Sequence, residues 1–116
     1  MKQNHNKLVR DRIPEIIKNS GNQCEISILS TAEYQVSLRE KVIEEAREVA
    51  AASSSEELVK EIADLYEVID ALVTVMEIDK AAIIRKQKQR REERGGFQKR
   101  IKLISTSFTP YSIFEK

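Results

Sequence analysis

The sequence predicts a mainly α-helical protein, and three observations lead to this prediction. Apolar residues recur at helical spacing through two long central segments, at about 31–52 and 56–77. Ser-x-x-Glu patterns, which are typical of helix starts, open both segments. The apolar residues are mainly Leu, Ile, Val and Ala, with 5% aromatic residues and no Trp, a composition that suits packed helices. We expect one helical bundle in a single domain over residues 1–116.

The first predicted element is a short amphipathic helix in the stretch IPEIIKNSG, where Pro14 fits the first turn and Gly21 fits the end. In the next stretch, CEISILS, apolar residues alternate, which predicts a strand at about 24–30. The stretch KRIKLISTSF alternates in the same way and predicts a strand at about 100–107. These two strands could pair as a small antiparallel sheet beside the helices.

Two long helices follow the first predicted strand. Ser30 and Glu33 have the spacing of a capping box, which starts a helix running to about residue 52. The serines at 53–55 break that helix, and Ser54 with Glu57 gives a second capping box. The second long helix therefore covers about 56–77.

A third helix is expected at about 79–93, and the paired glycines of RGGF end it. The charge along the chain is uneven, although the net charge is only +1. Residues 33–79 contain 13 acids and 4 bases, whereas residues 80–102 contain 10 bases and 2 acids. This asymmetry indicates two surfaces with different tasks, or two segments that face one another.

Several classes of protein are excluded by composition. Cys24 is the only cysteine, so an internal disulfide is impossible and a free thiol in a reducing compartment is expected. No apolar run approaches the roughly 20 residues of a membrane span, and the N-terminus has no apolar signal region. We expect a cytoplasmic protein. The C-terminal stretch TPYSIFEK carries Tyr111, Ile113 and Phe114, which are apolar enough to dock on a neighbouring surface.

Acidic residues interrupt the apolar face of the first long helix. At about 100° per residue, Glu45 lies inside the apolar arc, Glu48 and Lys41 lie at its edge, and Glu44 turns toward solvent. The arc itself is formed by Tyr34, Leu38, Val42 and Val49.

The second long helix shows the same interruption. Glu61 lies within its apolar stripe and Asp64 lies close beside the stripe. The stripe consists of Leu58, Ile62, Leu65, Ile69, Leu72 and Met76. Two Glu-x-x-acid pairs on successive helices are therefore expected to point toward the surface where those helices meet.

Such carboxylates need a cation, because burying an unpaired charge costs several kcal/mol. Lys41 and Arg47 are the bases near them in sequence, too few to neutralise four acids, so a divalent metal is indicated. Oxygen ligands without His or Cys select Mg²⁺, with Mn²⁺ as the other candidate. His5 is the single histidine, which argues against a zinc site. The alternative is that the acids lie on exposed helix faces and pair with Lys or Arg.

The acidic motif resembles that of a known group of enzymes. The order K-x-x-E-E-x-x-E, twelve residues, then E-x-x-D is formed by Lys41, Glu44, Glu45, Glu48, Glu61 and Asp64. It resembles the all-α NTP pyrophosphohydrolases, the MazG-like superfamily that includes phosphoribosyl-ATP pyrophosphohydrolase and dimeric dUTPases. The stretches KLVRDRIPEII (7–17) and RGGF (94–97) are similar to the small single-domain branch of house-cleaning nucleotide pyrophosphatases.

The resemblance implies Mg²⁺-dependent hydrolysis of a nucleoside triphosphate, expected to be noncanonical, to a monophosphate and pyrophosphate. The implied metal ligands are Glu45, Glu48, Glu61 and Asp64. The resemblance also implies a homodimer or homotetramer with sites near the subunit interface. Phosphoribosyl-ATP or dUTP are the alternative substrates.

Roles in such a reaction can be assigned to particular side chains. Glu48 or Glu45 could take the proton of the attacking water. Lys41 could contact a phosphate oxygen, or form only a surface ion pair with Glu45. In the basic helix Arg94, before the two glycines, is the preferred phosphate contact and Arg90 the second. The other bases there fit an exposed helix face.

Further candidates stand outside the acidic motif. Arg10 and Arg12 could also reach the site. Base-stacking groups, each of which could equally be a core residue, are Tyr34, Tyr66 and Phe97. A helical dimeric module that binds nucleic acid through residues 80–102 is the competing function. It is less favoured because it leaves the acids on the apolar faces unexplained.

Overall fold

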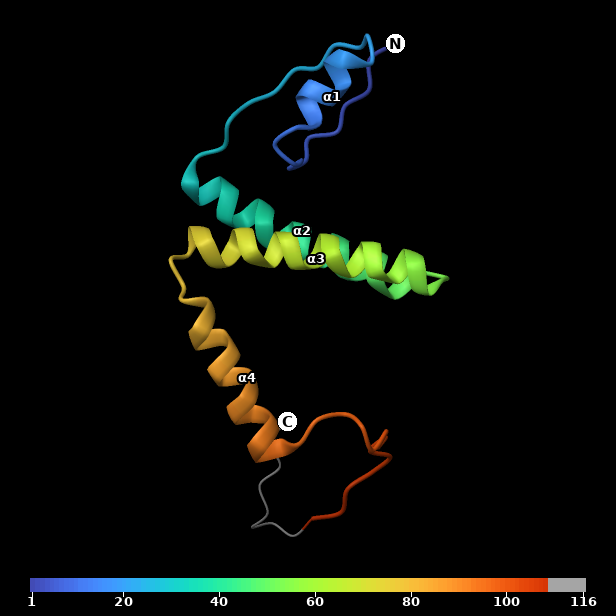
Figure 1. The fold of residues 1–116 in the computed structure, drawn as a ribbon, viewed down its shortest axis with the longest axis vertical. Helices are drawn as coiled ribbons and strands as arrows, with labels where there is room; N and C mark the ends of the chain where they lie inside the picture. Colours follow the sequence, from blue (N-terminus) through green and yellow to red (C-terminus); the bar gives the residue numbers. More distant parts are fainter. Residues whose placement is uncertain (109–116) are drawn as a thin grey trace. The chain divides into compact units, whose positions relative to one another are not determined.

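The structure, a computed structural model, describes residues 1–108 and contains four helices and no strand within that range. The all-α prediction is therefore confirmed. The chain divides into two compact units, Met1–Lys80 and Ala81–Lys116. The helices, shown along the ribbon of Figure 1, are α1 (Ile13–Asn19), α2 (Thr31–Ala51), α3 (Ser55–Val75) and α4 (Lys80–Arg94).

Helix α1 begins and ends as its sequence predicts. Pro14 lies in the first turn, where a missing backbone N–H costs nothing. Beyond the last turn, Gly21 adopts a left-handed conformation with φ of 87°. This lets the Asn22 amide donate to the Ile17 carbonyl at 3.2 Å, closing the helix end.

Helix α2 starts with a complete capping box. The Glu33 amide donates to Ser30 Oγ at 3.2 Å, and the Ser30 amide donates to Glu33 Oε1 at 3.2 Å. The pKa of the Glu33 carboxyl lies below its ordinary value, because the Ser30 hydroxyl and, to a lesser extent, the Ser30 backbone amide donate to the carboxylate. The ionised form of Glu33 therefore stabilises the start of α2.

The start of α3 differs from the predicted capping box. Ser54 Oγ accepts from the Glu57 amide at 3.1 Å, as expected. The Glu57 carboxylate, however, accepts from the backbone amide and hydroxyl of Ser53, at 3.1 and 2.9 Å. The bonds from Ser53 lower the pKa of Glu57. The return bond reaches one residue further back because the three serines offer Glu57 a choice of donors.

Helices α2 and α3 pack side by side and form a hairpin (Figure 1). The buried apolar residues among those described are Leu38 of α2, 3% exposed, and Val73 of α3. Val73 lies outside the predicted stripe of α3. Three stripe residues are more than a third exposed, and these are Leu58, Ile69 and Met76. These stripe residues stay exposed because a helix packed against a single partner buries only a narrow strip of its surface.

The predicted two-stranded sheet is wrong. Residues 24–30 and 100–107 contain no strand. The alternating apolar side chains point to no core, since Ile28 is 89% exposed and Ile101 and Leu103 are exposed as well. Alternation over so few residues is a weak signal, and a two-stranded ribbon without a packed face has little stability of its own.

Helix α4 has every residue exposed and ends at Gly95, whose φ is 85°. The Gly95 amide donates to the Arg91 carbonyl at 2.7 Å, so the glycine end predicted from RGGF is confirmed. Within residues 1–108, no helix combines the length and the apolar character needed to cross a bilayer. Tyr111, Ile113 and Phe114 lie outside the described residues.

Candidate functional site

Three carboxylates from α2 and α3 come together on the hairpin. One oxygen of each of Glu45, Glu61 and Asp64 lies within 4.8 Å of the other two. We call these residues the carboxylate cluster. Helical spacing explains the arrangement, because Glu61 and Asp64 are one turn apart on α3 while Glu45 faces them from α2. The side chains of Glu45 and Glu61 are only 12% and 11% exposed, and that of Asp64 is 29% exposed.

Glu48, the fourth predicted ligand, does not join this cluster. It is exposed one turn after Glu45 on α2, and the three clustered carboxylates do not include it. Its predicted position at the edge of the apolar arc accounts for the exposure. Of the two acid pairs in the sequence motif, the structure thus brings together one member from α2 and both from α3.

Lys41 lies beside the cluster with its side chain largely buried. Its Nζ is 3.3 Å from Glu44 Oε2 and 3.5 Å from Glu45 Oε1. The alternative expected for Lys41, an ion pair with Glu45, is therefore present. Glu44 is half exposed, lies 3.9 Å from Lys7 Nζ and is not a member of the cluster.

The cluster has more cationic neighbours than the sequence suggests. Lys60 Nζ lies 3.3 Å from Glu61 Oε1 and 3.7 Å from Asp64 Oδ2. Arg10 Nη2 donates to Asp64 Oδ1 at 2.8 Å. The interpretation that Lys41 and Arg47 are the only bases near the acids is wrong, and Arg47 is exposed. Lys60 could have been found from sequence, since it stands one position before Glu61 and four before Asp64.

The ion pairs of Lys60 affect its titration as well as its position. The pKa of Lys60 is raised because its ammonium donates to Glu61 and faces the negative charges of Glu61 and Asp64. Two like charges 4 Å apart repel by about 4 kcal/mol at an effective dielectric of about 20. Three clustered carboxylates are thus stable only with compensating positive charge, which Lys41, Lys60 and Arg10 provide in part from the rim.

The donor set fits a hard divalent cation. The clustered ligand atoms are all carboxylate oxygens, two of them on nearly buried side chains, and they converge from two helices. Oxygen-only sites of this kind suit Mg²⁺, Mn²⁺ or Ca²⁺ more than zinc. Glu45, Glu61 and Asp64 could therefore hold a divalent metal.

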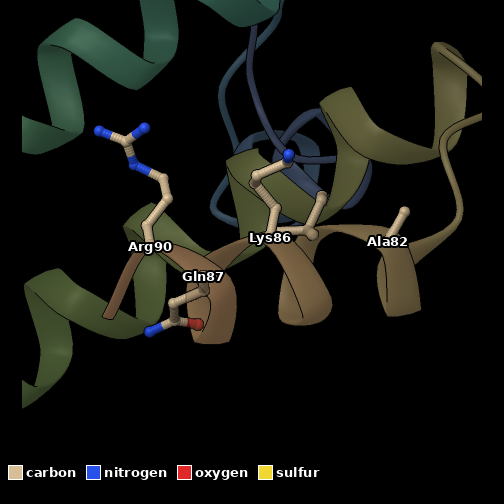
Figure 2. A pocket seen from close by; sticks show the side chains of 5 residues that line it. Ala82, Lys86, Gln87 and Arg90 are labelled. Carbon is tan, nitrogen blue, oxygen red and sulfur yellow. The ribbon is translucent and has the colours of Figure 1, made fainter. Parts of the chain in front are cut away.

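The predicted phosphate contacts Arg90 and Arg94 lie on α4. Arg90 borders an open hollow of about 480 Å³ along this helix, together with Ala82, Ile83, Lys86 and Gln87. Figure 2 shows Lys86 and Arg90 extending from the same helix past the hollow. Arg94 is exposed at the last turn. Every residue of α4 is exposed, including Arg90 and Arg94.

The aromatic candidates have different environments. Tyr34 is half buried and lines a second open hollow of about 380 Å³, with Asp70 and Thr74 among its other walls. Tyr66 and Phe97 are exposed, which makes them surface residues and not core. Arg12, the other basic candidate of the N-terminal stretch, pairs with Glu15 at 3.2 Å and not with the cluster.

Comparison with known proteins identifies the family. The model of the family described as phosphoribosyl-ATP pyrophosphohydrolase matches residues 15–91, a range that contains the whole carboxylate cluster. An uncharacterized protein of Mycolicibacterium smegmatis is 49% identical over 47 residues, which are 40% of this chain and 48% of that protein. The chain thus spans about half the length of this curated relative. No solved structure matches the chain.

The matched family is part of the MazG-like all-α NTP pyrophosphohydrolase superfamily, so the resemblance seen in the acidic motif is confirmed at that level. Four helices without a strand in residues 1–108, a carboxylate cluster on the central hairpin and the match over residues 15–91 agree with one another. The chain belongs to the phosphoribosyl-ATP pyrophosphohydrolase family.

Proposed function

We propose that this protein hydrolyses a noncanonical nucleoside triphosphate to a nucleoside monophosphate and pyrophosphate, and so removes unwanted nucleotides from the pool. The observation that carries the proposal is the convergence of Glu45, Glu61 and Asp64 in a chain that matches a pyrophosphohydrolase family. Phosphoanhydride hydrolysis depends mainly on positioning and on neutralising phosphate charge. A carboxylate cluster that holds a divalent cation meets the second need.

The proposed cofactor is Mg²⁺, with Mn²⁺ as the other candidate, held by Glu45, Glu61 and Asp64. When bound, the ion neutralises phosphate oxygens and lowers the pKa of a coordinated water. Glu48 is the candidate for two roles, fourth ligand or proton acceptor. Its position outside the cluster supports the second role, because a carboxylate that holds no metal is left to accept a proton.

The phosphates need further positive charge. Lys41 already lies 3.5 Å from Glu45 at the rim of the cluster, which supports its role as a phosphate contact. Arg94 and Arg90 are proposed as additional contacts, since the planar guanidinium matches phosphate oxygens and α4 leaves both exposed.

A second candidate substrate is phosphoribosyl-ATP, which the description of the matching family favours. It carries the same triphosphate group, so the same residues would act on it. The nucleic-acid-binding alternative gains no support from the hairpin, because clustered carboxylates repel a phosphate backbone unless a cation intervenes.

We also propose that the chain is one functional domain. It assembles as a homodimer or homotetramer in the cytoplasm. Leu38 and Val73 are the buried apolar residues among those described, too small a core for a chain of this length to be stable alone. Apolar side chains in pairs seven positions apart remain exposed on the hairpin, and these are Val36 and Ile43 on α2 and Val59 and Tyr66 on α3. A second copy that covers these faces would complete the core.

Pyrophosphate release from a panel of nucleotides tests the proposal. The panel contains dUTP, dITP, XTP, phosphoribosyl-ATP, and oxidised and methylated nucleoside triphosphates, each with Mg²⁺ and with chelator. We expect turnover of at least one member that requires the divalent ion and yields the monophosphate. For Glu45→Ala we expect the rate of pyrophosphate release to fall by more than about 100-fold. Substitution of a residue that only supports a metal ligand typically costs about 10- to 100-fold, and loss of the ligand itself should cost more. If wild type and Glu45→Ala behave alike on every member, the proposed function is wrong.

A further inference from the structure

The N-terminal stretch before α1 reaches the carboxylate cluster through Arg10. Arg10 Nη2 donates to Asp64 Oδ1 at 2.8 Å, although the two residues are 54 positions apart. The neighbouring Lys7 lies 3.9 Å from Glu44 of α2. Two bases of one stretch thus contact the two helices that carry the cluster.

The exposed position of this contact leaves Arg10 accessible to a ligand in solution. The side chain of Arg10 is 59% exposed, and Asp64 is the most exposed member of the cluster. Exposed ion pairs contribute little to the stability of a fold. A guanidinium offers five N–H donors in a planar fork. Contact through Nη2 therefore leaves donors that can face a second anion beside the cluster.

Charge balance indicates which anion fits. A divalent cation held by the cluster adds positive charge next to Asp64, which weakens the attraction between Asp64 and Arg10. The guanidinium then lies at the rim of the metal-loaded cluster with free donors. A phosphate oxygen accepts such donors in a bidentate manner, and the pairing of Arg with phosphate is among the strong charge-assisted hydrogen bonds.

We propose that Arg10 is a phosphate-binding residue of this site, which pairs with Asp64 in the free protein and with the triphosphate of the substrate in the complex. This inference rests on the proposed function, since it names a further substrate-binding group of the same site. Arg12, two positions away, serves as the matched control because it carries the same charge in the same stretch and pairs with Glu15 instead.

The test measures two binding events separately on the full chain. Mn²⁺ alone is titrated calorimetrically into wild type, Arg10→Gln and Arg12→Gln. Inorganic triphosphate is then titrated into the Mn²⁺-saturated proteins. For Arg10→Gln we expect Mn²⁺ affinity equal to that of wild type or several-fold higher, because a competing cation has gone. We expect its triphosphate affinity to fall about tenfold or more, as the loss of a charged hydrogen bond implies.

Arg12→Gln should match wild type in both titrations. Arg10→Lys keeps the charge and loses the fork, so its triphosphate affinity should fall between those of wild type and Arg10→Gln. It also serves as the second variant if Arg10→Gln does not fold.

Triphosphate affinity of Arg10→Gln within about twofold of wild type overturns the proposal. So does a joint loss of Mn²⁺ and triphosphate binding, which indicates a structural role, or an equal loss in Arg12→Gln. If wild type binds Mn²⁺ and inorganic triphosphate but hydrolyses no nucleotide of the panel, the proposed function fails while the role of Arg10 is still decided. If wild type is active and Arg10→Gln equals it in every measurement, only the role of Arg10 fails.

Discussion

Lys60 and Glu61 are adjacent on α3, yet the lysine is largely exposed while the glutamate is buried, and their charged groups lie 3.3 Å apart. The long lysine side chain folds back over the helix surface to reach the carboxylate. The pKa of Lys60 is raised by this contact, first through the hydrogen bond to Glu61 and then through the charges of Glu61 and Asp64. Lys60 is therefore a local source of the positive charge that the cluster needs when no metal is bound.

Lys60→Met is expected to destabilise the metal-free protein at neutral pH. Because the folded-state pKa of Lys60 is raised, its contribution is fully present below the unfolded value of about 10.4 and is lost as pH rises through the folded value. Saturating Mg²⁺ should shrink the difference, since the ion replaces the missing charge. Denaturant unfolding at pH 7 and in the alkaline range, with and without Mg²⁺, measures this. Lys88→Met on the exposed face of α4 is the control, and an equal effect there would contradict the explanation.

Glu48→Gln and Glu45→Gln should separate proton transfer from metal binding. For Glu48→Gln we expect kcat to fall by about 10²–10⁴-fold, the usual contribution of a general base, while Mn²⁺ affinity changes little. For Glu45→Gln we expect Mn²⁺ affinity and turnover to fall together. Calorimetric Mn²⁺ titration and steady-state kinetics give both quantities. Loss of Mn²⁺ binding in Glu48→Gln would instead assign Glu48 to the metal.

Leu38→Ala should cost about 2–5 kcal/mol in the free energy of unfolding, because Leu38 is 3% exposed and its removal leaves a cavity in the hairpin. Urea unfolding followed by circular dichroism measures the change. Leu103→Ala, the same substitution at an exposed position, should stay within about 0.5 kcal/mol of wild type. Similar costs for the two variants would show that Leu38 is not part of the core.

Glu33→Gln should lower the stability of the protein at pH 7 and leave it unchanged in acid. The capping hydrogen bonds lower the folded-state pKa of Glu33, so its contribution is present above the unfolded value of about 4.3. It is lost as pH falls through the folded value. Thermal unfolding at pH 7 and near pH 3 tests this sign. Glu40→Gln on the same helix, outside the cap, should show no such difference between the two conditions.

Ile43→Lys should weaken the proposed self-association while α2 and α3 still pack. Ile43 is exposed in the single chain, so the charge has no cost there, whereas burial against a second copy would make it unfavourable. Light scattering after size-exclusion chromatography gives the mass, and circular dichroism checks helix content. Lys18→Glu on α1 is a charge-changing control. An unchanged mass for Ile43→Lys would place the interface elsewhere.

The helices were predictable because their signals are local. Capping at Ser30 and helix-ending glycines at Gly21 and Gly95 depend on neighbours within a few positions, and each lies where the sequence predicts it. The strands failed for the opposite reason. Strand pairing requires a distant partner and a covered face, and the exposed Ile28 and Ile101 have no such face.

The site shows the same division between local and distant information. Helical periodicity in two neighbouring segments was enough to predict that Glu45, Glu61 and Asp64 face one surface. It also placed Glu48 at the edge, where a small rotation decides between joining the cluster and facing solvent. The contact of Arg10 with Asp64 depends on how the N-terminal stretch folds back, which no periodic pattern encodes.

The members of the carboxylate cluster lie close together along the chain, and this affects how the protein folds. Glu45 and Glu61 are 16 positions apart, joined by a short turn between two helices. Closing so small a loop costs little entropy, and helical hairpins form rapidly. The carboxylate cluster can thus form early in folding, before contacts between distant segments such as that of Arg10 with Asp64. A cation bound at that stage would stabilise the hairpin before any nucleotide is bound.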